Sequence, residues 1–397
     1  MGHNPDDFSF LSNQRESEQS MFDTTTLLQE LVAINSINPD LVPEGPGERE
    51  IALFVAHWLE EAGIEVCWDE PVPGRPNVIG ILRGSGGGRS LQLNAHMDTV
   101  GVAGMTHPFD PRIEGKRLYG RGAFDMKGGL AASMVALAQA RQFSLRGDVL
   151  LTAVADEEYA SLGTQSIVSQ WHTDAAIVTE PSELNLCIAH KGFQWLEITT
   201  QGQAAHGSRP DLGRDAILKM GPILLGLENL DRTLRASPSH PLLGSGSLHA
   251  SLIEGGQELS SYPAHCTLQL ERRTLPGETA PLLEAEIQNI LAHIQHNDPT
   301  FLASAKTTCV RDPFANASDA AIVQALSDQV TTHLGSAPEM IGAPWWTDAA
   351  LFAAAGISTV IFGPGGSGAH ATVEWADLTR VQHCSEILLT TIQKFCA

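Results

Sequence analysis

Basic residues are scarce in this chain of 397 residues, which has 24 lysines and arginines against 46 aspartates and glutamates and a formal net charge of −22. No stretch of the sequence gathers the basic side chains. Proteins that bind nucleic acid need clustered lysine and arginine to neutralise phosphate groups, so we expect no nucleic-acid partner. Most of the acidic excess is typical of solvated surface, and the rest is available as ligands for metal ions.

The sequence also has neither paired cysteines nor a long apolar run. Its six cysteines stand singly and form no C-x-x-C pair, which excludes a zinc knuckle and indicates no disulfide framework. No apolar run approaches the roughly 20 residues of a membrane-spanning helix. Residues 1–20 have neither the basic start nor the apolar core of a signal peptide. We therefore expect a cytoplasmic protein with no membrane contact and a flexible N-terminal tail over residues 1–20.

Short apolar segments alternate with helical stretches along the chain. The segments typical of strands are 77–82, 90–95, 148–154, 175–180 and 358–363. Stretches with helical spacing of apolar residues include 21–33, 47–62 and 128–143. This alternation predicts an α/β fold, with a mostly parallel sheet flanked by helices. The length predicts two domains, or one domain with a large insertion.

Histidines and carboxylates follow the predicted strands. They are His96 and Asp98, the run Asp156 to Glu158, Glu180, His370 a few residues after the last strand, and Asp125 just ahead of a predicted helix. Ligands of such sheets bind beyond the carboxyl ends of the strands, so we expect these side chains to meet at one edge. Carboxylates gathered there repel each other unless cations lie between them. Imidazole and carboxylate without thiolate suit zinc, with manganese or cobalt as substitutes.

Each of these residues also has a plainer interpretation when it is taken alone. A single histidine is more often a hydrogen-bonded structural residue than a ligand, and an aspartate ahead of a helix is often an N-cap. The glycines around Asp125 fit neither the phosphate-binding loop of nucleoside triphosphatases nor a dinucleotide fingerprint. The convergence of several such residues on one edge is what favours a metal site.

From about residue 22 onward the sequence resembles the dinuclear zinc amidohydrolases and peptidases that include acetylornithine deacetylase, succinyl-diaminopimelate desuccinylase, aminoacylases and carboxypeptidase G. The resemblance covers nearly the whole chain, and its motifs occur in the family's order and spacing. They are NAHMDTV, LYGRGAFDMKGGLAA, ADEEYASLGT, VTEPS, AHKGFQWLEIT, GQAAHGSRP, ERRTLPGET and GAHATVEW.

The resemblance implies a role for each of the clustered residues. His96 and Glu180 would hold one Zn²⁺, Glu158 and His370 the other, and Asp125 would bridge both, with Co²⁺ or Mn²⁺ as alternative metals. Glu157 would be the general base that activates the water between the metals. Asp98 would orient the imidazole of His96, an arrangement that fixes its tautomer. Asp156 receives no role from the resemblance.

The resemblance also implies a discontinuous catalytic domain. Its two parts would be residues 21–189 and 309–397, and the α+β segment 190–308 inserted between them would be a lid that forms a homodimer. The strands and two helical stretches of that segment are consistent with a separate domain. The insertion would explain why His370 lies so far along the chain from the other ligands.

Further residues would contact the substrate. His206 matches a histidine of the family that stabilises the tetrahedral oxyanion, commonly in the partner subunit. Arg273 and Arg311 would bind a substrate carboxylate with their guanidinium groups. Gly365 and Gly366 would offer backbone N–H groups to the same carboxylate. The alternatives are a surface-loop histidine for His206 and structural ion pairs for the arginines.

Together these features predict a metal-dependent hydrolase that cleaves the amide bond of an N-acyl amino acid by metal-hydroxide attack, with Glu157 as general base. A carboxypeptidase or dipeptidase with the same site is the nearest alternative, acting on a short peptide. A non-catalytic binding relative is the third alternative. It would have lost a ligand or the base, whereas all five ligand positions and Glu157 are filled here.

Overall fold

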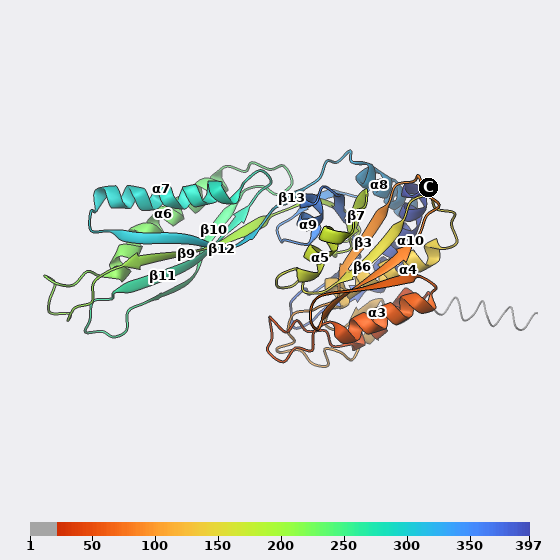
Figure 1. Ribbon diagram of the computed structural model, residues 1–397, viewed down its shortest axis with the longest axis horizontal. Coiled ribbons are helices and arrows are strands. Elements are labelled where there is room, and N and C mark those ends of the chain that lie inside the picture. Colours follow the sequence, from red (N-terminus) through yellow and green to blue (C-terminus); the bar gives the residue numbers. More distant parts are fainter. Residues whose placement is uncertain (1–21) are drawn as a thin grey trace, which may run out of the picture. The chain divides into compact units, whose positions relative to one another are not determined.

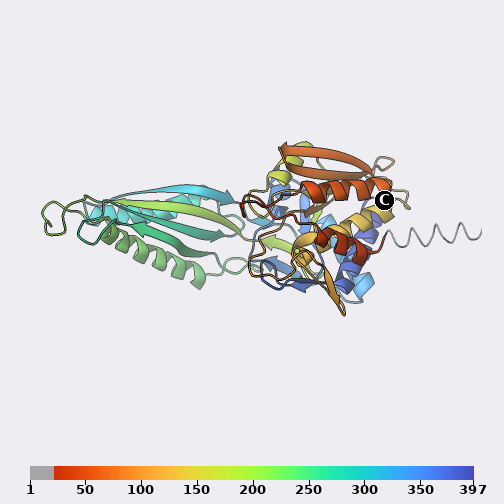
Figure 2. The same cartoon turned by 90° about the horizontal axis from the view of Figure 1, so that it is seen from below.

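The computed structural model describes residues 22–397, so the predicted tail over residues 1–20 lies outside the described part. The chain forms two compact units (Figures 1 and 2). Of the described residues, unit 1 comprises 22–188, 316–341 and 347–397, and unit 2 comprises 189–315 and 342–346. Within residues 22–397, no helix is both long enough and apolar enough to cross a membrane.

Unit 1 is built on a mixed sheet whose central strands are parallel. The described strands follow the order β1-β2-β6-β3-β7-β15-β8-β13, and β14 pairs with β8. Pairing is parallel from β6 through β3 and β7 to β15, and antiparallel toward both ends. Their bounds are β1 Glu65–Val72, β2 Arg75–Leu82, β3 Leu91–His96, β6 Val149–Val154, β7 Ala175–Val178, β8 Leu186–His190, β13 Phe314–Ala315, β14 Met340–Ala343 and β15 Ser358–Ile361. The predicted α/β class is therefore confirmed.

Helices cover both faces of this sheet (Figure 1). They are α2 Thr24–Ala33, α3 Arg49–Glu61, α4 Gly128–Ala140, α5 Leu162–Gln170, α8 Ala321–Leu334, α9 Ala349–Ala354 and α10 Leu378–Phe395. The crossovers from β3 to β6 and from β6 to β7 run in opposite directions across the sheet. Right-handed crossovers therefore place α4 and α5 on opposite faces. A small second sheet joins β4 Arg112–Glu114, β5 Arg117–Tyr119, β16 Gly366–Ser367 and β17 Trp375–Asp377.

Helix α4 lies unusually close to the sheet because small residues line it. Nearly all of its residues are buried, and a Cβ added at Gly129 would lie 2.1 Å from the carbonyl oxygen of Thr179. Only glycine allows this approach. The contact fixes the start of α4, which follows Asp125, against the chain that leads from β7 to Glu180.

Unit 2 is an antiparallel sheet with two helices packed on one of its faces (Figure 2). The strand order is β10-β11-β9-β12, and the bounds are β9 Gly192–Gln201, α6 Ala216–Ala236, β10 Ser247–Gly255, β11 His265–Thr274, α7 Ala280–Asn297 and β12 Leu302–Arg311. Alternate residues of β9 are buried, as expected for a sheet with one covered face. The buried side chains, such as Ile198 and Leu268, pack with Ile223 of α6 and Ile287 of α7.

The bounds of unit 2 differ from those of the predicted insertion, which ended at residue 308. Strand β12 continues to Arg311, and Cys309 pairs with Trp195 of β9. Unit 2 extends to residue 315 and also takes in residues 342–346. The backbone ladder of the four-stranded sheet therefore holds residues that the sequence assigned to the second part of the catalytic domain.

Candidate metal centre

The carboxyl ends of three neighbouring parallel strands deliver the first group of predicted ligands to one edge of the unit 1 sheet (Figure 1). His96 is the last residue of β3, Glu157 and Glu158 follow β6, and Glu180 follows β7. Asp125 lies in the short segment η1 Ala123–Lys127 that leads directly into α4, and His370 lies between β16 and β17 with a left-handed φ of 59°. Parallel pairing thus brings together residues that are far apart in the sequence.

The first cluster consists of His96, Asp125 and Glu180. The Nε2 atom of His96 lies 3.3 Å from Oδ1 of Asp125 and 3.5 Å from Oε1 of Glu180. One ligand atom from each of the three residues lies within 4.8 Å of the other two. The imidazole of His96 and the carboxylate of Glu180 are buried.

The second cluster consists of Asp125, Glu158 and His370. The Nε2 atom of His370 lies 3.3 Å from Oδ2 of Asp125 and 3.1 Å from Oε2 of Glu158. The three ligand atoms again lie within 4.8 Å of one another. Asp125 therefore belongs to both clusters and presents one carboxylate oxygen to each imidazole.

Burial and the close contacts between the clustered carboxylates and imidazoles shift the pKa values of these groups. Burial, with the neighbouring negative charge of Asp125, raises the pKa of Glu180 and of Glu158 above the usual carboxyl range. Hydrogen bonds to Asp125 and Glu158 raise the pKa of His370 to about 10. Burial alone would raise the pKa of Asp125, but the hydrogen bonds from both imidazoles hold it well below its usual range. The two glutamates and His370 are thus shifted toward their protonated forms, whereas Asp125 is shifted toward its carboxylate form.

Glu157 lies beside the clusters but belongs to neither of them. Burial, with the charge of nearby Glu180, raises its pKa well above the usual carboxyl value, against the opposing effect of His96. Its backbone N–H donates to Oδ1 of Asp98 at 3.1 Å. The backbone N–H of Glu158 also donates to Asp98. The same carboxylate therefore binds the main chain of both residues, although only the side chain of Glu158 belongs to a cluster.

Asp98 has more partners than the sequence suggested. The Nδ1 atom of His96 lies 3.0 Å from the main-chain carbonyl oxygen of Asp98 and 3.5 Å from its carboxylate. The carboxylate instead accepts the N–H groups of both Glu157 and Glu158. The backbone carbonyl is thus the nearer partner of the imidazole, and the carboxylate supports the turn that follows β6.

The turn that carries Asp125 is held by a buried carboxylate to which the sequence assigned no role. Glu374 accepts the backbone N–H groups of Gly122, Phe124 and Asp125 at 3.0–3.1 Å. It also accepts a hydrogen bond from Nη1 of Arg121 at 2.5 Å, and both side chains are buried. Glu374 therefore fixes the main chain of the residue that both clusters share.

Replacing Glu374 by alanine should lower the free energy of unfolding by about 3–5 kcal/mol, because it leaves the buried guanidinium of Arg121 without its carboxylate. Urea denaturation of the two proteins measures this difference. Glu374→Gln, which keeps an acceptor of similar shape for the backbone N–H groups, should lose less. A loss below about 1 kcal/mol for Glu374→Ala would contradict the role given to this contact.

The family model of peptidase family M20/M25/M40 matches residues 92–394. The five residues of the two clusters and Glu157 all lie in this range. The protein belongs to this family. As an M20/M25/M40 member it is a hydrolase, and the resemblance that the motifs indicated is confirmed.

Two curated relatives match this M20/M25/M40 protein over most of its length. The chain is 29% identical to acetylornithine deacetylase of Myxococcus xanthus, over 93% of this chain and 96% of the relative. It is 28% identical to N-formyl-4-amino-5-aminomethyl-2-methylpyrimidine deformylase of Halalkalibacterium halodurans, over 93% of each chain. Among solved structures, the YXEP protein of Bacillus subtilis, described as a dinuclear metal-binding peptidase of the M20 family, superposes with a TM-score of 0.75 at 16% identity, over 95% of this chain and 99% of that one. This likeness shows that the fold is shared.

The other side chains that the sequence predicted to contact the substrate belong to unit 2. His206 lies in unit 2, where its exposed imidazole accepts the N–H of Ser208. Arg273 and Arg311 are also in unit 2, where their guanidinium groups lie over the rings of Phe193 and Trp346 at 5.0 and 5.4 Å. Their roles toward a substrate stay predictions.

The glycine loop ahead of His370 already has an internal partner. The N–H of Gly366 donates to Oε1 of Glu183 at 3.0 Å, and Glu183 pairs with Arg380. This N–H is therefore engaged by a carboxylate of the protein itself. The predicted use of the Gly366 N–H for a substrate carboxylate would require Glu183 to give up this bond, and the use of Gly365 stays a prediction.

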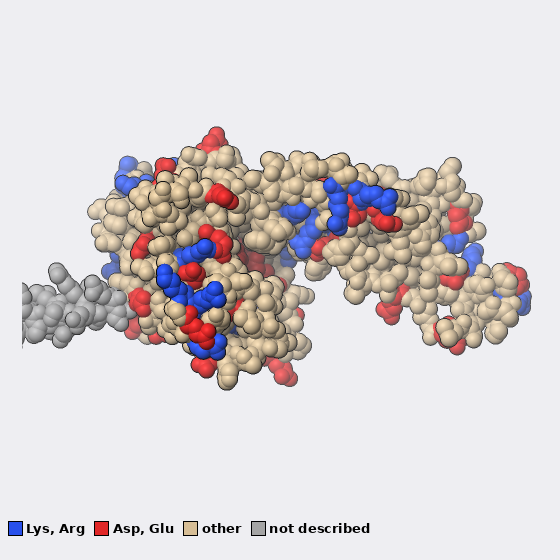
Figure 3. Space-filling model, turned by 180° about the vertical axis from the view of Figure 1, so that it is seen from behind, with Lys and Arg blue, Asp and Glu red and all other residues tan. Residues whose placement is uncertain are grey.

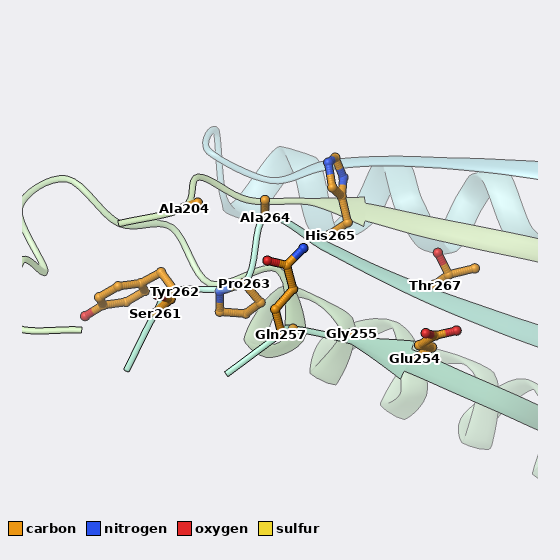
Figure 4. A pocket seen from close by; sticks show the side chains of 11 residues that line it. Ala204, Glu254, Gly255, Gln257, Ser261, Tyr262, Pro263, Ala264, His265 and Thr267 are labelled. Atoms are coloured by element: carbon orange, nitrogen blue, oxygen red, sulfur yellow. The ribbon is translucent and has the colours of Figure 1, made fainter. Parts of the chain in front are cut away.

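Unit 2 contains a cavity of about 390 Å³ (Figure 4). It lies between the end of β10, the start of β11 and residues 261–264, with polar groups from Glu254, Gln257 and His265. None of the site residues predicted from the sequence lines it.

On the face shown in Figure 3, basic side chains lie beside acidic ones, so that face has no continuous basic band.

Proposed function

We propose that this M20/M25/M40 hydrolase is a two-cation amidohydrolase that removes the acyl group from an N-acyl amino acid. The single observation that carries the proposal is the carboxylate of Asp125. Its two oxygens each lie 3.3 Å from a different histidine, and each histidine is backed by a second carboxylate. A carboxylate placed in this way suits a pair of metal ions a few ångströms apart.

The side chains present fit such a pair of metal ions. The donor set is two imidazoles and three carboxylates with no thiolate, which zinc accepts and which cobalt or manganese also tolerate. Among residues 22–397, the buried Oε1 atom of Glu158 has no hydrogen-bond partner. A buried carboxylate oxygen left without a donor is costly unless a cation satisfies it. We infer that His96, Glu180 and Asp125 hold one ion, and that Asp125, Glu158 and His370 hold the other.

Two divalent cations bound at such a site lower the pKa of a shared water and polarise the amide carbonyl. In the proposed reaction the carboxylate of Glu157 accepts the proton of the attacking water and then donates it to the leaving nitrogen. Burial raises the pKa of Glu157 above that of a free carboxyl group, which favours its taking up the proton of the attacking water. Glu158, one residue later, holds its cation throughout.

The proposed substrate contacts are a histidine and an arginine. His206 would donate a hydrogen bond to the oxyanion, and Arg273 would pair with the carboxylate of the amino acid, with Arg311 as a second candidate. We favour Arg273 over Gly366 because the N–H of Gly366 is already donated to Glu183. The homodimer formed through unit 2 and the cytoplasmic location remain predictions.

The relatives support hydrolysis of an N-acyl group. By their names, one removes an acetyl group and the other a formyl group. A peptidase is the second candidate, because a structure of the same fold is described as a dinuclear metal-binding peptidase. The experiment that tests the proposal compares N-acetyl amino acids with dipeptides after defined loading with zinc, manganese or cobalt. We expect kcat/KM at least tenfold higher for the best N-acetyl amino acid, and the reverse order would establish a peptidase.

Cation binding should release protons at pH 7, because an imidazole must be neutral to bind a metal. Burial lowers the pKa of His96, but hydrogen bonds to Asp125 and Asp98 raise it above the usual value, and hydrogen bonds to Asp125 and Glu158 raise the pKa of His370 to about 10. The raised pKa values favour the protonated imidazoles, so protons compete with the cations for these ligands. Affinity should accordingly rise as pH increases toward these pKa values and fall at lower pH.

Calorimetric titration with Co²⁺ in buffers of different protonation enthalpy counts the released protons. His57→Gln, which removes an exposed histidine outside both clusters, should leave the count unchanged. A binding heat that does not depend on the buffer would contradict the assignment of the two histidines.

A further inference from the structure

Asp156, the first of three consecutive acidic residues after β6, closes the turn that carries Glu157 and Glu158. It is fully buried and has a left-handed φ of 69°, which is uncommon for residues other than glycine. Its carbonyl oxygen accepts the N–H of Ala160, and its Oδ2 atom accepts the N–H of Leu162. Both ends of the turn are thus tied to this one residue.

A buried arginine fixes Asp156 from the other side. Nη2 of Arg75 donates to Oδ1 of Asp156 at 2.8 Å, while Nε and Nη2 donate to the two carboxylate oxygens of Glu48 at 2.7 and 2.8 Å. Oε1 of Glu48 also accepts the N–H of Asp156 at 3.2 Å. The arginine and both carboxylates are buried, and a bidentate guanidinium has little freedom to shift in such a contact.

The side chain of Asn38 links this ion pair to the metal centre. Its Nδ2 atom donates to Oδ1 of Asp156 at 3.0 Å and to Oδ2 of Asp98 at 2.8 Å. Asp98 in turn accepts the N–H groups of Glu157 and Glu158. An unbroken set of hydrogen bonds therefore runs from Arg75 through Asp156, Asn38 and Asp98 to the main chain of the two glutamates.

We propose that Asn38 and Asp156 are positioning residues that hold the main chain of Glu157 and Glu158 in place. The proposal rests on the proposed function, in which Glu157 moves the proton and Glu158 holds a cation. Neighbouring residues with different tasks tolerate little displacement, because a shift of about 1 Å can cost 100-fold in rate. Asn38 is the critical link, since it alone among the described side chains bonds both Asp98 and Asp156.

A purely stabilising role for these residues makes a different prediction. Loss of a buried hydrogen bond would then lower stability throughout unit 1 without a specific change in the turn. Thr152→Val provides the matched comparison. Thr152 is buried in β6, the strand that leads to the same turn, and its hydroxyl accepts hydrogen bonds from Gln92 and Asn94.

The test measures amide hydrogen exchange of the segment 155–162 by mass spectrometry in full-length Asn38→Ala, Asp156→Asn and Thr152→Val. Asp156→Asn preserves the shape of the side chain, and Asn38→Ala leaves the pairing of Arg75 with Glu48 intact. We expect exchange at Glu157 and Glu158 to rise at least tenfold in the first two variants and to stay unchanged in Thr152→Val. Unchanged exchange in Asn38→Ala and Asp156→Asn would overturn the proposal.

Kinetics at saturating metal provide the second readout. On the best substrate of the panel, we expect kcat to fall at least tenfold in Asn38→Ala with KM within twofold of the wild type, and Thr152→Val to keep its kcat. Faster exchange with an unchanged kcat would overturn the positioning role while leaving the proposed function intact. If the wild-type protein cleaves no member of the panel, the proposed function fails. The exchange rates then still test the positioning role, together with the affinity for Co²⁺. A tenfold loss of Co²⁺ affinity in Asn38→Ala and Asp156→Asn would support it, and unchanged exchange and affinity would overturn it.

Discussion

Glutamine in place of Glu157 is expected to lower kcat by about 10²–10⁴-fold, the range that a positioned general acid–base group contributes. The substitution keeps the size of the side chain and the backbone N–H that donates to Asp98. It removes the carboxylate that would take the proton from the attacking water and return it to the leaving nitrogen. Because Glu157 belongs to neither cluster, the variant should still bind two cations per chain.

Steady-state kinetics and metal analysis of the same preparation separate these two effects. Glu60→Gln, an equivalent change at an exposed position of α3, should leave both kcat and metal content unchanged. Full turnover by Glu157→Gln with both cations bound would show that another group moves the proton. Loss of a cation together with activity would place Glu157 among the ligands instead.

Asparagine in place of Asp125 is expected to weaken binding of both cations by more than about 100-fold, which exceeds the usual effect of losing a supporting group around a metal. The reason is that Asp125 is the one residue common to the two clusters. Activity should fall to the background of the metal-free protein. Metal content after gel filtration, measured by inductively coupled plasma mass spectrometry, provides the readout.

His96→Ala is the informative comparison for Asp125. His96 belongs only to the cluster that contains Glu180, so its loss should release one cation and leave the one near His370. If Asp125→Asn and His96→Ala each released a single cation, the carboxylate would not be shared. The two substitutions together therefore distinguish a bridged pair of cations from two separate sites.

The sequence was sufficient to predict the α/β class and the residues that meet at the edge of the sheet. Parallel strands end at the same edge, so residues such as His96 and Glu180, each at or just after a strand, had to lie near one another. Asp125 and His370 lie outside the strands, but their places ahead of a predicted helix and after the last predicted strand brought them into the same prediction. The family motifs then implied which ion each would hold.

The supporting contacts could not be predicted, because they join segments far apart in the chain. Glu374 reaches the turn of Asp125 across about 250 residues, and Arg75 reaches Asp156 across 81. Nothing in the local sequence marks either pair. Each became visible only when folding placed a buried carboxylate opposite unsatisfied N–H groups.

Contacts between distant segments also explain why the sequence misplaced the end of the insertion and left the Gly366 N–H without a partner. Residues 309–311 continue a strand of unit 2, which depends on pairing with β9 rather than on a break in composition. The sequence alone suggested that the N–H of Gly366 could bind a substrate carboxylate. In the structure this N–H donates to Glu183, which is 183 residues away in the chain.

The most direct test of the bridged two-cation site is anomalous X-ray diffraction from crystals of the zinc-loaded protein, measured on either side of the zinc absorption edge. We predict two peaks on opposite sides of the Asp125 carboxylate. One should lie about 2.0–2.2 Å from ligand atoms of His96 and Glu180, and the other at the same distance from Glu158 and His370. A single peak, or peaks that do not share Asp125, would contradict the account.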